Sequence, residues 1–231
     1  MKLKKILKYN LNRYKFNHIK IKIDCEKKWF GNDYGGFYIN PKFISEKSII
    51  YSIGIGEDIS FDLSLIKEFN CNVYGFDFTP KSVEWIANNN FDSKFKFYDY
   101  GIGTETKTAK FFFPKNINNV SGSLINQKNV NNEKSIDVRV KSLKDIMYDH
   151  NHIKIDVLKL DIEGYEYELL ESINFSKLQV NQILIEFHER FLPDGKAKTL
   201  KIINILSSYG FEIFAISDSF EEVSFINKQL F

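Results

Sequence analysis

The chain has 231 residues, 43% of them hydrophobic, and its 32 basic and 30 acidic side chains leave a formal net charge of +2. This length and apolar content suit one domain with a sizeable core and exclude a disordered chain. The nearly balanced charge argues against nucleic acid as the main partner. Two distant cysteines, Cys25 and Cys71, exclude a disulfide framework or a structural zinc site.

The first 44 residues are expected to form a basic helix and an aromatic cap segment. Leu3, Ile6, Leu7 and Leu11 have helical spacing among lysines, which predicts a short amphipathic helix. This helix is expected to pack on the domain, and a weak contact with a membrane surface is the alternative. No long apolar run follows the lysines, so the sequence predicts no signal peptide or transmembrane segment and favours a cytoplasmic location.

The aromatic cap lies at residues 29–43, where aromatic side chains alternate with glycines in the pattern of a short hairpin. Trp29, Tyr34 and Tyr38 are candidates for stacking on a sugar ring. The alternative is that they only cover the core.

From residue 45 to 231, apolar β-rich runs alternate with helical patterns, as in an α/β domain with crossover helices. The expected parallel strands are 48–53, 71–76, 93–101, 154–161 and 180–188. Helices are expected at 58–69, 80–89, 142–150, 164–173 and 196–208. An added antiparallel pair, 108–114 and 134–140, flanks a polar loop at 114–134, and a hairpin, 210–217 and 221–227, follows the last helix.

Polar residues follow each parallel strand, where ligands of open α/β sheets bind. Gly54 and Gly56 leave a bare backbone between a strand and a helix, which suits a nucleotide-like cofactor. Asp77 ends the next strand, at the position where a carboxylate binds ribose hydroxyls. The alternative for the two glycines alone is a tight turn, and Asp58 alone could be a helix N-cap.

Two adenosine cofactors fit this loop. A dinucleotide requires a third glycine where Ile59 stands, and its pyrophosphate disfavours the acidic Glu57 and Asp58. S-adenosylmethionine carries no phosphate and has a positive sulfonium and ammonium, so these acids favour it.

Several stretches resemble the FkbM-type S-adenosylmethionine-dependent methyltransferases, across roughly residues 30–228. They are "IIYSIGIGEDISFD", "VYGFDFTP", "YDYGIG", "DVLKLDIEGYEYELL" and "ILIEFH". The resemblance implies a class I methyltransferase, Rossmann-like fold with a seven-stranded, mostly parallel sheet and a C-terminal antiparallel hairpin. Ser52 and Asp58 depart from the common class I pattern of an acid before and a glycine after the loop.

The residues expected to contact the cofactor are Ser52, Gly54, Gly56, Glu57, Asp58, Asp77, Phe78, Asp99, Tyr100, Gly101 and Asp161. Tyr100 is a candidate for stacking beside the adenine, although Asp99 and Tyr100 could equally be ordinary turn residues. An NAD-dependent Rossmann protein and a catalytically silent nucleotide-binding module are the competing interpretations.

Methyl transfer to a neutral hydroxyl requires a base, and His188 is the expected one because the ordinary pKa of histidine lies near neutrality. Glu186 is expected to orient His188 or the acceptor, and Glu163 to stand beside them. The carboxylates and the histidine could also hold a divalent metal, which the sequence leaves open. The resemblance implies an acceptor hydroxyl on a sugar, glycan or other small molecule, and oligomeric state is not predicted.

Overall fold

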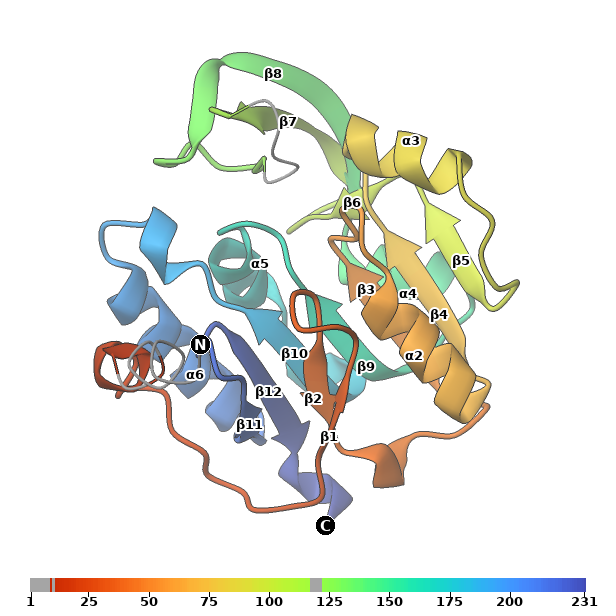
Figure 1. Ribbon diagram of the computed structural model, residues 1–231, viewed down its shortest axis with the longest axis vertical. Helices are drawn as coiled ribbons and strands as arrows, with labels where there is room; N and C mark the ends of the chain where they lie inside the picture. The colour runs from red at the N-terminus through yellow and green to blue at the C-terminus, as the bar shows by residue number, and fades with distance from the viewer. Residues whose placement is uncertain (1–8, 10, 117–121) are drawn as a thin grey trace.

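A seven-stranded sheet forms the centre of the computed structural model, which describes residues 9, 11–116 and 122–231 (Figure 1). In spatial order its strands are β5 (Phe95–Tyr98), β4 (Asn72–Phe76), β3 (Ile49–Ile53), β9 (Lys154–Leu160), β10 (Gln179–Glu186), β12 (Glu222–Asn227) and β11 (Phe211–Ile216). Neighbours from β5 to β10 pair in parallel, whereas β12 is antiparallel to both β10 and β11. This confirms the expected class I α/β sheet with its antiparallel C-terminal hairpin.

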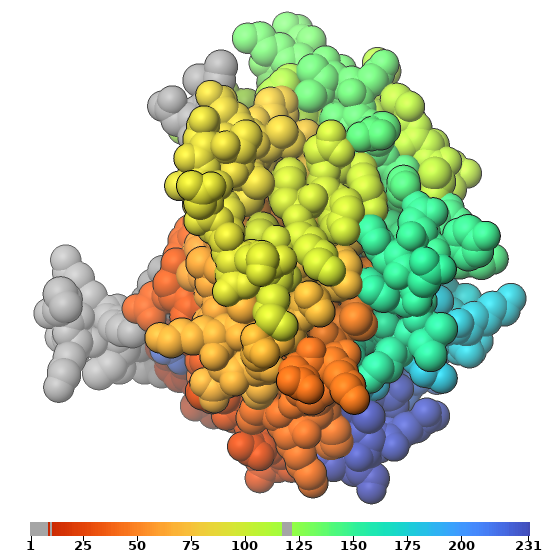
Figure 2. Space-filling model, turned by 90° about the vertical axis from the view of Figure 1, so that its right-hand side faces the viewer, coloured from red at the N-terminus to blue at the C-terminus, as the bar shows by residue number. Residues whose placement is uncertain are grey.

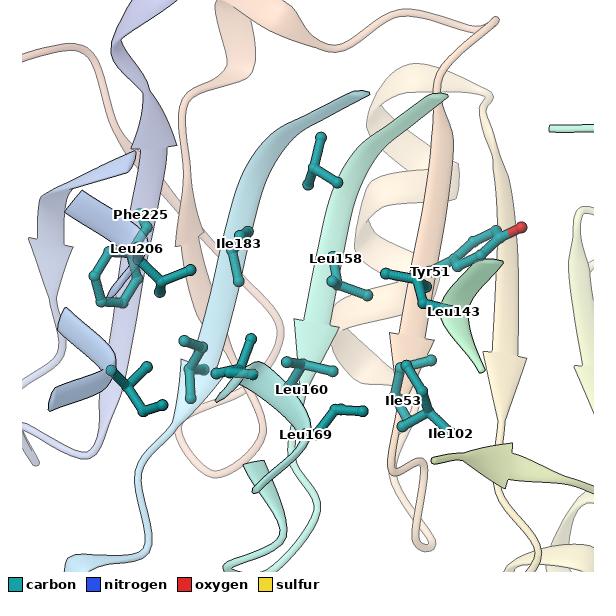
Figure 3. Packing of buried hydrophobic residues seen from close by; sticks show 14 of the residues in the cluster. Tyr51, Ile53, Ile102, Leu143, Leu158, Leu160, Leu169, Ile183, Leu206 and Phe225 are labelled. Carbon is teal, nitrogen blue, oxygen red and sulfur yellow. The ribbon is translucent and has the colours of Figure 1, made fainter. Parts of the chain in front are cut away.

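Helices cover both faces of this sheet because successive strand residues point to opposite sides. Tyr51 and Leu158 pack with residues of α4 (Leu143–Asp149), α5 (Glu166–Ser172) and α6 (Gly195–Ser208). Figure 3 shows strand side chains Ile53, Leu160 and Ile183 on this side, with Leu143, Leu169 and Leu206 coming from the three helices. The other face packs against α2 (Ser60–Phe69) and α3 (Pro80–Ala87).

Local signals begin and end the helices where the sequence indicates. Pro80 occupies the first turn of α3, where its missing N–H is not needed. Ser142 caps α4, because its Oγ accepts a hydrogen bond from the backbone N–H of Asp145 at 3.1 Å. Asn70 ends α2 in the left-handed conformation. Short 3-10 helices lie at Pro41–Phe43, Phe175–Lys177, Glu189–Phe191 and Lys228–Leu230.

The aromatic cap segment forms the predicted hairpin, with β1 (Lys28–Phe30) antiparallel to β2 (Phe37–Ile39), and lies beside α2 in front of the main sheet (Figure 1). The buried Gln182 side chain of β10 accepts from the backbone N–H of Asn40 at 2.7 Å and donates to its carbonyl at 3.1 Å. The hairpin and the main sheet therefore share one core.

A second, three-stranded sheet has the order β6 (Gly101–Ile102), β8 (Val130–Lys141) and β7 (Lys107–Pro114). The antiparallel β7–β8 pairing was expected, while the two-residue strand β6 was not. Figure 2, which faces the sheet edge formed by β5, shows β7 and β8 at the top of the molecule, beyond α3. Within the predicted polar loop, Ser123 pairs with Phe112 through two backbone hydrogen bonds, and residues 117–121 lie outside the described part.

The predicted amphipathic helix lies largely outside the described residues, including its apolar positions Leu3, Ile6 and Leu7. Residues 11–15 are helical, and Leu11 is 70% exposed. Among the described helices, none has the length and apolar character needed to cross a membrane.

Asp62 is an acid in the core, 1% exposed in the first turn of α2. Burial raises the pKa of its carboxyl to about 6, although the nearby Lys159 ammonium and Ser52 hydroxyl act in the opposite direction. The folded chain thus holds the Asp62 proton more tightly than the unfolded chain, whose ordinary pKa is 3.8.

Between these two pKa values, folding is coupled to the uptake of one proton by Asp62. The contribution of this protonation to the free energy of unfolding is therefore full below pH 3.8 and is lost as the pH rises through about 6. We predict that the free energy of unfolding of Asp62→Asn, relative to that of the wild type, increases by about 2 kcal/mol as the pH is raised from about 4.5 to about 7.5. Urea unfolding at several pH values measures this change. The exposed Asp24→Asn is the control, and a pH-independent difference for Asp62→Asn would contradict the prediction.

Candidate functional site

A cavity of about 840 Å³ opens at the carboxyl ends of β3, β4, β9 and β10. This is the edge where open α/β sheets bind ligands. The described residues that line it are 32–35, 53–58, 76–79, 101–102, Phe111, 122–124, Lys159, 161–163, Tyr165, Glu186, Arg190, Ser219 and 221–222.

The glycine loop after β3 lies on this cavity in a conformation that favours glycine. Gly54 and Gly56 have φ angles of +80° and +58°. A Cβ atom at Gly54 would lie 1.7 Å from the backbone oxygen of Asp161, so a larger residue does not fit without moving the backbone. The buried Lys159 ammonium donates a hydrogen bond to the Gly54 carbonyl at 2.9 Å. This bond ties the glycine loop to β9.

Asp77 binds the same loop from the end of β4. Its Oδ2 accepts hydrogen bonds from the backbone N–H groups of Ile55 and Gly56 at 3.0 and 2.9 Å, and its Oδ1 accepts from Thr79 at 2.7 Å. Burial raises the pKa of this carboxyl, and the three backbone donors act against that rise. A carboxylate oxygen can accept two hydrogen bonds, and Oδ1 accepts one backbone bond here. Asp77 can therefore still accept a hydrogen bond from a hydroxyl group in the cavity.

Asp58 joins the loop to the aromatic cap. Its Oδ1 accepts from the Ser60 backbone at 2.8 Å, and its Oδ2 accepts from the Asn32 side chain at 2.7 Å. The Asn32 Oδ1 in turn accepts from the backbone N–H groups of Tyr34 and Gly35. The cap therefore forms one wall of the cavity, with Tyr34 on it, while Glu57 lines the loop side.

Acidic side chains converge on His188 at the ends of β9 and β10. Its Nε2 lies 3.8 Å from Asp161 Oδ1, 3.4 Å from Glu163 Oε2 and 3.5 Å from Glu186 Oε1. Glu163 has a φ of +52° and is followed by Gly164 at +95°, so the chain turns sharply after β9. A non-glycine residue in this region is uncommon and marks a place where the surroundings fix the backbone.

The fully buried Glu166 fixes the other side of the imidazole. Its Oε1 lies 3.2 Å from His188 Nδ1 and accepts from the His188 backbone at 2.9 Å, while its Oε2 accepts from Gly164 at 2.8 Å. The His188 ring also stacks on Phe191, with ring centroids 5.5 Å apart.

This environment argues against the expected role of His188 as the base. His188 is 1% exposed and is not among the described residues that line the cavity. Burial lowers the pKa of its imidazole, but the carboxylates of Glu166, Glu163 and Glu186 outweigh burial and raise the pKa to about 10. An imidazole that is buried behind the cavity wall and whose pKa is raised by its acidic neighbours is poorly placed to take a proton from an acceptor.

Glu186 and Glu163 do reach the cavity, with side chains 18% and 20% exposed. Burial, followed by the Asp161 carboxylate, raises the pKa of Glu186 to about 8 against the opposing charges of His188 and Arg190. Arg190 lies 3.7 Å from Glu186 and 2.6 Å from Glu221.

Most of the predicted site residues line the cavity: Gly54, Gly56, Glu57, Asp58, Asp77, Phe78, Gly101, Asp161, Glu163 and Glu186. Three predicted cofactor residues do not reach it. Ser52 is fully buried in the core near Asp62, Asp99 pairs with Arg139 at the surface, and Tyr100 packs on Phe76. Their predicted contacts with a cofactor are thus not supported by where they lie.

Of the three aromatic candidates in the cap, only Tyr34 lines the cavity, whereas Trp29 and Tyr38 pack edge-on against each other. Asn32, Lys159 and Arg190 are cavity residues to which the sequence interpretation gave no role. For Lys159 a signal existed, since a lysine in the middle of an apolar parallel strand needs a buried partner.

Comparisons with known proteins give the family of the chain. Residues 31–213 match a family model described as the methyltransferase FkbM domain. Among solved structures, the chain is similar to the fibrillarin pre-rRNA processing protein of Methanococcus jannaschii, with 14% identity and a TM-score of 0.44 over 91% of this chain and 86% of that chain. A search of curated proteins gave no match.

We predict that Gly54→Ala lowers the free energy of unfolding by about 3 kcal/mol, since it combines a left-handed backbone with a clash against the Asp161 carbonyl. Gly210→Ala is the matched control. Gly210 also has a positive φ, +91°, but a Cβ there meets nothing closer than 3.6 Å, so about 1 kcal/mol is expected. Chemical denaturation measures both, and equal losses would show that the clash is relieved by movement of the loop.

Proposed function

Because the chain belongs to the methyltransferase FkbM domain family, we propose that it transfers the methyl group of S-adenosylmethionine to a hydroxyl of a sugar, glycan or other small molecule. The observation that carries the proposal is the shared cavity, in which the glycine loop and Asp77 face the acidic ends of β9 and β10. Such a cavity offers one side to a nucleoside and another to a hydroxyl acceptor.

The loop side suits the cofactor. Asp77 lies where it can accept hydrogen bonds from the ribose hydroxyls, and Phe78 and Ile102 offer apolar surface for the adenine. Glu57 and Asp58 stand where a pyrophosphate would be repelled, whereas the positively charged methionyl ammonium is attracted. These features favour S-adenosylmethionine over a dinucleotide.

The reaction is an in-line displacement at the methyl carbon. The acceptor oxygen forms the new bond to the methyl carbon while the carbon–sulfur bond breaks. The electron pair of the broken bond stays on sulfur and yields neutral S-adenosylhomocysteine. The hydroxyl proton leaves to a carboxylate, and we assign Glu163 this role because its side chain lines the cavity.

We infer that a polar, ring-shaped acceptor binds beside the cap wall of the cavity. Tyr34 lies on the cap wall, and the pKa of its hydroxyl is raised by partial burial and then by the carboxylates of Asp161, Glu186 and Glu163. Tyr34 is 81% exposed, so its ring offers an apolar face to a sugar. We therefore propose Tyr34 as an acceptor-positioning residue.

We predict that calorimetric titration detects binding of S-adenosylhomocysteine and none of NAD. Asp77→Ala should weaken S-adenosylhomocysteine at least about 30-fold, because hydrogen bonds to a carboxylate contribute about 2 kcal/mol. Asp77→Asn keeps the side-chain volume beside the glycine loop and should also weaken binding. Asp99→Ala is the control, since Asp99 ends the neighbouring strand but lies outside the cavity lining.

The outcomes separate the competing functions. Unchanged affinity in both Asp77 variants would remove Asp77 from the ribose contact. Binding of NAD alone would favour a dinucleotide enzyme. Binding of S-adenosylhomocysteine without methyl transfer to any acceptor would favour a silent binding module.

We predict that Tyr34→Ala raises the KM for a sugar acceptor about tenfold and leaves the affinity for S-adenosylhomocysteine unchanged. The assay measures transfer of a tritiated methyl group to a panel of free and nucleotide-linked hexoses. Tyr34→Phe should retain more of the affinity, since it keeps the ring. Tyr148→Ala is the control, because Tyr148 is 82% exposed on α4 and is not among the cavity-lining residues described. An unchanged KM in Tyr34→Ala would contradict the positioning role.

A further inference from the structure

We propose that Asp161, Glu186 and His188 bind a divalent transition-metal cation at the wall of the cavity, with Mn²⁺ as the probe that tests it. Binding of the cation does not depend on the proposed function, whereas the catalytic use given to it below rests on that function.

The first support is the geometry of the three side chains. One ligand atom from each lies within 4.8 Å of the other two. His188 Nε2 is 3.8 Å from Asp161 Oδ1 and 3.5 Å from Glu186 Oε1. Two ligand atoms bound at about 2.2 Å from one cation lie roughly 3 to 4.4 Å apart. Small movements of the two partly exposed carboxylates would therefore bring all three atoms around one ion.

A second, independent support is the orientation of His188. Its Nε2 makes no hydrogen bond with any described residue, although the side chain is 1% exposed and a buried polar atom normally has a partner. Nδ1 lies 3.2 Å from Glu166 Oε1, so Nδ1–H can donate to that carboxylate while Nε2 points at Asp161 and Glu186. Metal-binding histidines are held in this way, with the second ring nitrogen donating to a carboxylate.

The charge balance of the cluster also calls for a cation. Four carboxylates surround one imidazole, those of Asp161, Glu163, Glu166 and Glu186. Lys159 lies 3.9 Å from Asp161, and Arg190 also pairs with Glu221, so basic side chains offset only part of this charge. A dication bound between these acids would offset part of their negative charge.

The site is placed for chemistry as well as for binding. Asp161 and Glu186 line the cavity while His188 lies behind them, so the remaining positions of the cation would face the cavity, as in catalytic metal sites. Two carboxylate oxygens and one imidazole nitrogen form a mixed donor set. Mg²⁺ and Ca²⁺ prefer oxygen ligands, whereas divalent transition metals accept an imidazole nitrogen as well.

Under the proposed function, the cation would bind the acceptor hydroxyl through its oxygen and lower the pKa of that hydroxyl. The proton would pass to Glu163, which lines the cavity and is not one of the three ligands. The resulting alkoxide would attack the methyl carbon as described above.

The test is a titration of the EDTA-treated full chain with Mn²⁺. Electron paramagnetic resonance measures binding as the loss of the signal of free Mn²⁺. One bound Mn²⁺ per chain is expected. Asp161→Asn and Glu186→Gln should each weaken Mn²⁺ at least about tenfold, since affinity follows the number of charged ligands. Both residues are partly exposed, so these variants should fold, and circular dichroism checks this. Glu168→Gln, an exposed acid on α5, is the control and should leave Mn²⁺ binding unchanged.

Competition by Ca²⁺ separates a built site from a general attraction of cations to acids. Ca²⁺ should displace Mn²⁺ poorly if the imidazole is a ligand. Absence of Mn²⁺ binding, equal displacement by Ca²⁺, or unchanged affinity in both Asp161→Asn and Glu186→Gln would overturn the metal proposal. S-adenosylhomocysteine is titrated into the same EDTA-treated protein. Its binding without Mn²⁺ binding would sink the metal site alone, and the reverse result would sink the cofactor assignment alone.

Discussion

The buried carboxylate of Glu166 holds together the two strand ends on which the acidic site depends. It bonds to Gly164 in the turn after β9 and to both the backbone and the ring of His188 after β10. A charge buried this deeply is stable only when it is paired and hydrogen-bonded, so the two segments are tied into one arrangement. The places of Asp161, Glu163 and Glu186 around the imidazole follow from this constraint.

Most of the fold could be predicted from the sequence because short, local patterns of residues determine its strands and helices. Alternating apolar runs and helical periodicity predicted the order of strands and helices, and the helices expected from residues 80 and 142 begin at Pro80 and Leu143. The site followed from one rule, that carboxyl ends of parallel strands meet at one edge. Gly54, Asp77 and Glu186 line the same cavity for that reason.

The site residues whose predicted roles the structure does not support are those whose role depends on the direction or the surroundings of the side chain. Ser52 shares a strand face with Ile50, two residues before it, and therefore faces α2 and the buried Asp62. The role of the cap wall rests on the bond between Asn32 and Asp58, and nothing in the local sequence indicates that pair. His188 has a suitable ordinary pKa, but its surrounding carboxylates change that value, and only the three-dimensional arrangement reveals them.

The position of the β1–β2 hairpin has a consequence for biosynthesis. Asn40 bonds to Gln182, and the Tyr38 carbonyl accepts a hydrogen bond from Ser224, so the hairpin packs on strands that follow it in the chain by 142 and 186 residues. Contacts between such distant parts of a chain form late, and they lower the rate of folding. On the ribosome, the hairpin can therefore pack on α2 first, whereas its hydrogen bonds to β10 and β12 form only after those strands have emerged.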